Sequence, residues 1–189
     1  MPQQRVLLLH GLSHHRSADH WLWWLAEELR RERIPVQYPQ SPSPDEPVLE
    51  EWVALAETEL EQLGSDPDAE RIVVAHSLGT ILWQHLASRG LARADRVLLA
   101  SPPLRERLEG RIAADWLAPI DVLGAIAAVP TTVVLRESDP YRPAMALEYT
   151  AGWDANVHVL PGEGHINSED GHGPFSAALD WVLKGRAFA

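Results

Sequence analysis

Short apolar runs alternate with stretches of helical periodicity along the chain. The runs are rich in leucine, isoleucine and valine, a composition typical of buried strands. Strands are predicted at 5–9, 34–37, 71–75, 96–100, 131–136 and 157–160. Helices are predicted at 21–31, 45–63, 77–90 and 175–183. Because strands that alternate with helices of this length indicate βαβ units, we expect an α/β fold. It should be a three-layer sandwich whose mainly parallel sheet, of about six strands, has helices on both faces.

The helix predicted at 45–63 differs from the others in its charge. Residues 45–70 carry ten acidic side chains and neither Lys nor Arg, whereas the rest of the chain is almost neutral. The segment Ser43-Pro44-Asp45-Glu46 has the spacing of a capping box with proline at the first helical position, so we expect the helix to begin there. A solvated outer face is the simplest interpretation of the charge, and a docking face for a basic partner is the alternative.

Length and composition narrow the class of protein. The chain has 189 residues, a net charge of −11 and no cysteine. This length predicts a single domain, 1–189, and the missing cysteine excludes a disulfide scaffold, a thiolate metal site and a cysteine nucleophile. The negative charge argues against nucleic acid or an anionic membrane as the main partner. Val6–Leu9 is too short for a signal-peptide core, and acidic residues interrupt the longest candidate membrane span, so a cytoplasmic location is expected.

One serine lies at the boundary between a predicted strand and a predicted helix. Ser77 has small residues two positions before and two after it, Ala75 and Gly79. Such neighbours are needed where the chain turns sharply from a strand into a helix and presents a nucleophilic serine. The C-terminal ends of parallel strands are also where functional groups gather. Ser77 is therefore a candidate nucleophile, and the alternative is a serine that only caps the helix.

Candidates for an acid and a base follow the last two predicted strands. Asp139 comes after strand 131–136, and His165 lies in a glycine-rich loop after strand 157–160. In this kind of fold the nucleophilic serine is followed along the chain first by the acid and then by the histidine. The order of residues therefore predicts a triad of Ser77, Asp139 and His165.

Four further residues are considered beside this triad. Glu137 is the reserve acid, and His172 is the second choice for the base because it lies farther along the loop. His158 is a poor base because it lies inside the last predicted strand. Asn167 is expected to orient the histidine loop through its amide.

The loop after the first strand is expected to complete the site. Backbone N–H groups of Leu12 and Leu78 are the candidate oxyanion donors, the second of them at a helix N-terminus. Gly11 would let the backbone approach a reacting carbonyl closely. His10 is interpreted as a structural hydrogen-bonding residue rather than a catalytic one.

A motif in the same loop indicates a different chemistry. His15-x-Ser17-x-Asp19-His20 differs by one residue from the H-x-H-x-D-H zinc pattern of metallo-β-lactamase-like hydrolases. Serine is a weak zinc ligand and the motif runs directly into a tryptophan-rich helix, so neither a metal nor a cofactor is expected. The tryptophans that open this helix, from Trp21 on, are interpreted as core packing, with a pocket wall as the alternative.

Several short motifs occur in an order that is characteristic of one family. The segments are His10-Gly11, His20-Trp21-x-x-Trp24-Leu25, Ala75-His76-Ser77-Leu78-Gly79, Ser138-x-Pro140-Tyr141 and Gly164-His165-Ile166-Asn167-x-x-x-Gly171-x-Gly173. They resemble the small α/β-hydrolase-fold serine hydrolases of the retinoblastoma-binding-protein-9/YdeN family over nearly the full length. The resemblance implies a compact Rossmann-like sheet without a large lid domain and a Ser-Asp-His triad at Ser77, Asp139 and His165. Many members have glycine where this chain has Ala75. The retinoblastoma-binding Leu-x-Cys-x-Glu segment of the animal member cannot occur in a chain without cysteine.

The candidate triad and the resemblance lead to one expected activity. A serine hydrolase is expected that cleaves carboxylic esters through an acyl-enzyme. Small or short-acyl substrates are favoured, because 189 residues leave little chain for a lid. The expected partner is a small-molecule acyl substrate, and the protein is expected to be a monomer or a weak homodimer. A peptidase or amidase that uses the same triad, and a non-catalytic binding protein with this fold, are the alternatives.

Overall fold

The computed structural model describes residues 3–142, 145–185 and 188. Six strands form one sheet in the order β2-β1-β3-β4-β5-β6, and every neighbouring pair is parallel. The strands are β1 (Gln3–Leu9), β2 (Val36–Gln37), β3 (Ala69–His76), β4 (Arg96–Ala100), β5 (Thr131–Ser138) and β6 (Asn156–Glu163). The α/β fold with a parallel sheet of about six strands is thereby confirmed, and no large lid domain is added to it.

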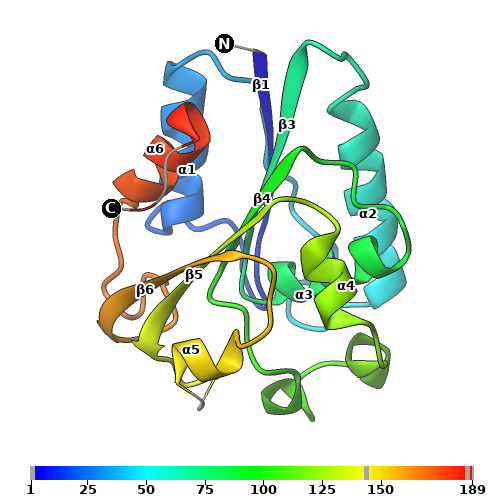
Figure 1. The fold of residues 1–189 in the computed structure, drawn as a ribbon, viewed down its shortest axis with the longest axis vertical. Coiled ribbons are helices and arrows are strands. Elements are labelled where there is room, and N and C mark those ends of the chain that lie inside the picture. The colour runs from blue at the N-terminus through cyan, green and yellow to red at the C-terminus, as the bar shows by residue number, and fades with distance from the viewer. Residues whose placement is uncertain (1–2, 143–144, 186–187, 189) are drawn as a thin grey trace.

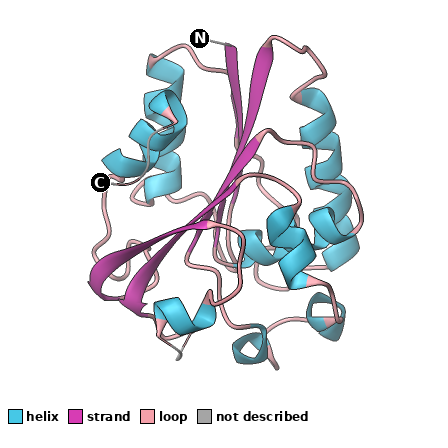
Figure 2. Cartoon of the chain, in the orientation of Figure 1, coloured by secondary structure: helices cyan, strands magenta, loops and turns pink. Residues whose placement is uncertain are grey.

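Helices cover both faces of this sheet (Figures 1 and 2). The helices are α1 (Trp21–Arg31), α2 (Leu49–Gln62), α3 (Leu78–Ser88), α4 (Val122–Ala127), α5 (Ala146–Tyr149) and α6 (Ser176–Lys184). Successive strand residues point to opposite faces, so Leu8 packs with α1 and α6 while Leu7 and Leu9 pack with α2 and α3. In the described part of the chain, no helix combines the length and the apolar character that a bilayer crossing needs.

The start of the acidic helix was predicted wrongly. Helix α2 begins at Leu49, with Val48 at the N-cap position and no side-chain capping bond. The supposed capping box instead closes a turn, in which the Glu46 N–H donates to the Ser43 carbonyl at 3.0 Å and Ser43 has a φ of 45°. Pro47 explains the difference, because a residue that precedes proline is disfavoured in the helical region.

The chain between β4 and β5 contains more structure than its sequence predicted. Two 3-10 helices, η1 (Arg105–Leu108) and η2 (Ala114–Leu117), lie in a stretch to which the sequence analysis assigned neither a helix nor a strand. Helix α4, between the same two strands, and helix α5, which follows β5, were not predicted at all. Helix α4 is capped by Asp121, whose carboxylate accepts a hydrogen bond of 2.9 Å from the Gly124 N–H. Such short helices leave little periodicity to detect in the sequence.

Candidate active site

The turn between β3 and α3 holds Ser77 in a conformation that is rare for a residue with a side chain. Ser77 has φ 54° and ψ −123°. Such backbone geometry costs on the order of 1–3 kcal/mol and persists only where its surroundings enforce it. Here the Ser77 N–H donates to the Ala100 carbonyl, and the Ser77 carbonyl accepts from both the backbone and the hydroxyl of Thr80. Ser77 occupies the N-cap position of α3, but its side chain makes no capping hydrogen bond.

Two glycines leave room for this turn. A Cβ on Gly79 would lie 2.5 Å from the Leu9 carbonyl oxygen, so β1 and α3 approach each other too closely for any side chain there. A Cβ on Gly11 would lie 2.8 Å from the Ser77 Cβ. Ala75 is fully buried in β3, so its methyl group is accommodated at this position.

The side chains of Ser77, His165 and Asp139 form a continuous hydrogen-bonded chain. The Ser77 Oγ lies 2.7 Å from His165 Nε2, and His165 Nδ1 lies 2.8 Å from Asp139 Oδ2. Because a carboxylate only accepts, the Nδ1–H donates to Asp139, which leaves Nε2 free to accept the serine proton. Asp139 is buried, and its Oδ1 also accepts from the Tyr141 N–H at 2.9 Å. The three residues predicted from their order along the chain therefore meet in space.

The loop that carries His165 is fixed by two side chains that the sequence analysis did not assign to the site. The His76 Nε2–H donates to the His165 carbonyl at 2.9 Å, and the Trp21 indole N–H donates to the Ile166 carbonyl at 2.8 Å. Both donors are buried. Burial also lowers the pKa of His76 well below its ordinary value, so the imidazole acts as a neutral donor.

The Asp170 carboxylate also binds the loop that carries His165. The His165 N–H donates to the Asp170 carboxylate, and the Asp170 N–H donates to the Asn167 side-chain oxygen at 2.9 Å. The Asn167 side chain thus supports Asp170, which in turn accepts the hydrogen bond from the His165 N–H. Gly164 is required beside them, since its φ is 124° and a Cβ there would lie 2.8 Å from the Asp170 Cγ.

The reserve candidates have other contacts. Glu137 accepts a hydrogen bond of 2.8 Å from the Gly162 N–H, which supports the irregular end of β6. His172 Nδ1 lies 3.1 Å from the Arg136 guanidinium. His158 lies within β6, as its sequence position predicted.

The loop after β1 lies directly against Ser77. Leu12 follows Gly11 and lines the cavity over the serine, and Leu78 is the first residue of α3. His10 bonds on both sides of its ring: Nδ1–H donates to the Gly11 carbonyl and Nε2 accepts from the Ser41 N–H, each at 2.9 Å. Burial lowers the pKa of His10 to about 4. The side chain is thus neutral and fully engaged.

The remaining histidines of this loop do not form a metal-binding cluster in the described part of the chain. His15 points to Asp45 at 3.1 Å, and His20 caps α1 by accepting from the Leu22 N–H. The rings of His14 and His20 lie 4.4 Å apart, and burial lowers the pKa of His14 to about 3 and that of His20 to about 4. Among the residues that the structure describes, no group of three or more His, Cys, Asp or Glu side chains could hold a metal ion.

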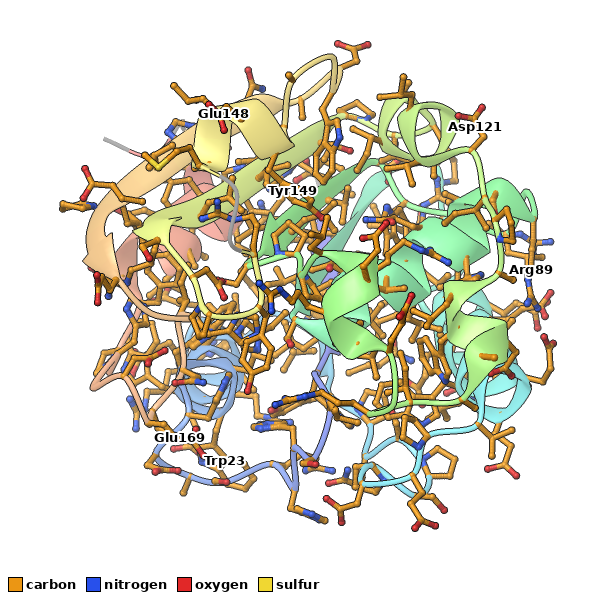
Figure 3. All side chains as sticks on the ribbon, turned by 90° about the horizontal axis from the view of Figure 1, so that it is seen from below. Trp23, Arg89, Asp121, Glu148, Tyr149 and Glu169 are labelled. Atoms are coloured by element: carbon orange, nitrogen blue, oxygen red, sulfur yellow. The ribbon has the colours of Figure 1, made fainter. Side chains whose placement is uncertain are left out.

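A cavity of about 260 Å³ lies over the Ser77–His165 pair. It opens at the edge of the sheet where the strands end, the edge seen in Figure 3. Among the described residues its aliphatic lining is Leu12 and Leu108, and most of the other lining side chains are serines, histidines and further polar groups. Trp116, in η2, does not belong to this lining; its ring packs edge-on against Trp52 in the core.

Comparisons with known proteins identify a family and a shared fold. The sequence model of a family described as "Serine hydrolase" matches residues 6–183. A YdeN-like hydrolase from Pectobacterium atrosepticum is 26% identical, with a TM-score of 0.71 over 95% of this chain and 89% of that one. The ydeN product of Bacillus subtilis is 20% identical (TM-score 0.77; 95% and 96% covered), and Est1E of Butyrivibrio proteoclasticus, solved with ferulic acid, is 11% identical (TM-score 0.70; 96% and 87%). These two show a shared fold. No curated protein matches the chain.

Proposed function

Because the chain belongs to the serine hydrolase family, as a small α/β hydrolase of the YdeN type, we propose that it cleaves carboxylic esters with Ser77 as the nucleophile. The observation that carries this proposal is the continuous chain of hydrogen bonds from the Ser77 Oγ through His165 to the buried Asp139. This arrangement supplies a nucleophile, a base and a group that fixes the tautomer of the base.

In the proposed reaction, His165 Nε2 takes the hydroxyl proton while the Ser77 Oγ attacks the ester carbonyl carbon. The tetrahedral oxyanion accepts hydrogen bonds from the N–H groups of Leu12 and Leu78. When the intermediate collapses, the alcohol leaves with the proton from His165, and an acyl-Ser77 ester remains. Water then attacks this ester with His165 again as the base, which releases the carboxylic acid and restores the serine. Asp139 holds the imidazolium in place during both steps.

The cavity favours a small substrate. Ligand pockets for drug-sized molecules commonly reach roughly 300–1,000 Å³, and the cavity over Ser77 holds about 260 Å³. The ester proposed for this site is therefore small or carries a short acyl chain. A peptidase or amidase reaction would use the same side chains, so a panel of esters and aminoacyl amides separates the two activities.

The assignment of the nucleophile is tested with p-nitrophenyl acetate and a fluorophosphonate probe. Ser77→Ala should abolish both ester turnover and labelling. Ser65→Ala, at an exposed serine outside the cavity lining, should retain both. Labelling that persists in Ser77→Ala would overturn the assignment, and loss of turnover on treatment with EDTA would favour a metallohydrolase.

The assignment of the acid is tested by two matched amide substitutions. Asp139→Asn should lower kcat by about 10³- to 10⁴-fold, because an amide at this position no longer fixes the Nδ1–H tautomer of His165. Glu137→Gln should leave kcat nearly unchanged, since its carboxylate bonds to Gly162. The reverse ranking of the two variants would identify Glu137 as the acid.

A further inference from the structure

A cation lines the cavity beside the candidate catalytic histidine. Arg111 lies in the turn between η1 and η2, and its guanidinium carbon is 5.1 Å from the ring centre of Tyr141. That ring lies 4.6 Å from the ring of His165, centre to centre. Tyr141 thus contacts both the base and the guanidinium, and Arg111, which is exposed, carries the positive charge. Arg111, Tyr141 and His165 all line the cavity.

The charge of Arg111 has no carboxylate partner within the described ranges 3–142, 145–185 and 188. Other arginines of the chain differ in this respect: Arg71, Arg89 and Arg96 each bind a carboxylate at 3.0 Å or less. Stacking on Tyr141 orients the planar guanidinium and leaves its N–H groups available for a ligand. The side chain is thus positioned without being neutralised.

The other charged residue of the cavity lining is Glu169. In the view of Figure 3, Glu169 lies on the side where α1 is drawn in blue, while the green η1–η2 segment lies across the centre of the view. Arg111 and Glu169 form no ion pair among the described residues. Glu169 therefore leaves the Arg111 guanidinium without a carboxylate partner among the described residues.

The uncharged part of the lining is polar as well. His14 and His20 lie on its wall as neutral imidazoles, and Ser13, Ser17 and Ser168 contribute hydroxyl groups. Long alkyl chains are bound by apolar walls, which this cavity lacks apart from two leucines. A compact polar substrate fits the lining better than a fatty acyl chain.

We propose that Arg111 selects esters that carry a carboxylate a few bonds from the scissile carbonyl. Its fork of N–H donors would bind that carboxylate, in one or two hydrogen bonds, while Ser77 attacks the ester. The inference rests on the proposed esterase function and adds a substrate class to it: short half-esters of dicarboxylic acids, or acyl esters of hydroxy acids. Arg111 is the residue that determines this specificity.

The experiment compares pairs of esters of similar size by measuring acid release at constant pH. Monoethyl succinate and ethyl butyrate differ in a carboxylate on the acyl side, and 3-acetoxypropanoate and propyl acetate differ in one on the alcohol side. In at least one pair the wild type should favour the carboxylate ester in kcat/KM. Arg111→Gln should reduce that preference about tenfold and leave the neutral ester within about twofold, since a charge-assisted hydrogen bond of this kind is worth roughly one such factor. Arg111→Lys should retain part of the preference.

Arg107→Gln is the matched control. Arg107 is exposed on η1, four residues before Arg111, and does not line the cavity. Arg107→Gln removes the same charge, so the preference of this variant for the carboxylate ester should equal that of the wild type. If Arg107→Gln and Arg111→Gln lose the preference for the carboxylate ester equally, long-range electrostatic attraction explains the preference, and the inference is overturned. Turnover of the neutral esters without any preference that depends on Arg111 would overturn the inference and leave the esterase function standing. Failure to turn over any ester would overturn both.

Discussion

Gly11 lies close against the candidate nucleophile, and a single added methyl group tests this approach. Gly11 is buried, and the Cβ of an alanine would lie 2.8 Å from the Ser77 Cβ and 3.1 Å from its Oγ. Real Cβ atoms essentially never make contacts as short as the first of these. Ser77 has little freedom to retreat, because its N–H bonds to Ala100 at 3.0 Å and its carbonyl bonds to Thr80 at 2.8 Å. The strain of Gly11→Ala therefore falls on the nucleophile itself.

The size of the effect follows from the cost of overpacking. One extra methyl group in a close-packed site costs about 1–3 kcal/mol. If that strain displaces the Ser77 Oγ from His165, it appears in the activation free energy, where each 1.36 kcal/mol is tenfold in rate. The expected loss in kcat/KM is thus roughly five- to 150-fold. Whatever part of the strain the fold absorbs instead should appear as a lower free energy of unfolding.

The assay combines p-nitrophenyl acetate turnover with urea unfolding of Gly11→Ala. Gly173→Ala serves as the control, because a Cβ on Gly173 meets nothing within 4 Å and its backbone does not require glycine. Gly173→Ala should match the wild type in both measurements. If Gly11→Ala also matches the wild type in rate and in stability, Gly11 does not approach the nucleophile as described and the reasoning is refuted.

Two further predictions concern buried groups beside the loop that carries His165. Trp21→Phe removes the hydrogen bond to the Ile166 carbonyl and leaves that oxygen buried without its donor, which should lower the free energy of unfolding by about 1–3 kcal/mol and lower kcat as the loop loosens. Urea titration and ester kinetics test it, and unchanged values in both would contradict it. His20 has its pKa lowered to about 4 by burial, so the unfolded chain binds more protons than the native one between pH 6.5 and 4, and acidification through this window destabilises the fold. His20→Asn keeps an acceptor for the helix cap. The free energy of unfolding, measured with urea at several pH values, should then fall less steeply on acidification, by up to about 1.4 kcal/mol per pH unit. An unchanged pH dependence would show that His20 is not buried in its neutral form.

The positions of the candidate triad could be predicted because parallel strands share an edge. Ser77 follows β3, and Asp139 and His165 follow β5 and β6, so the three lie at the same end of the sheet. The inference needed only strand boundaries accurate to a few residues and the order of the three side chains along the chain. It did not need the shape of any loop.

Local motifs were less reliable where the chain is shaped by proline or by tertiary contacts. The capping box at 43–46 has the right residues, yet Pro47 shifts the start of α2 to Leu49. Between β4 and β5, the turn that carries Arg111 follows a short 3-10 helix with no periodic pattern. Its place beside Tyr141 depends on the tertiary fold, which the sequence does not reveal. The walls of the cavity were therefore beyond sequence analysis.

The sequence analysis did not identify Trp21 and His76 as donors to the loop that carries His165, for a related reason. The bond from Trp21 to Ile166 spans 145 residues and the bond from His76 to His165 spans 89. In the sequence, Trp21 has the spacing of a core residue, which it also is, since its ring packs edge-on against His76. A core position and a positioning role are compatible in one side chain, because the indole buries its ring and still donates its N–H.

The neutrality of these donors has a consequence for the proposed chemistry. The rings of His76 and His165 lie 5.2 Å apart, so a permanent positive charge at His76 would oppose the imidazolium that must form on His165. At an effective dielectric constant of about 20, two unit charges at that distance repel by roughly 3 kcal/mol, which corresponds to about two orders of magnitude in rate. Burial prevents this, since it lowers the pKa of His76 well below its ordinary value. The two groups that fix the His165 loop from within the core, His76 and the Trp21 indole, are both uncharged donors. In the proposed reaction they therefore hold the loop in place without adding a positive charge that would repel the imidazolium.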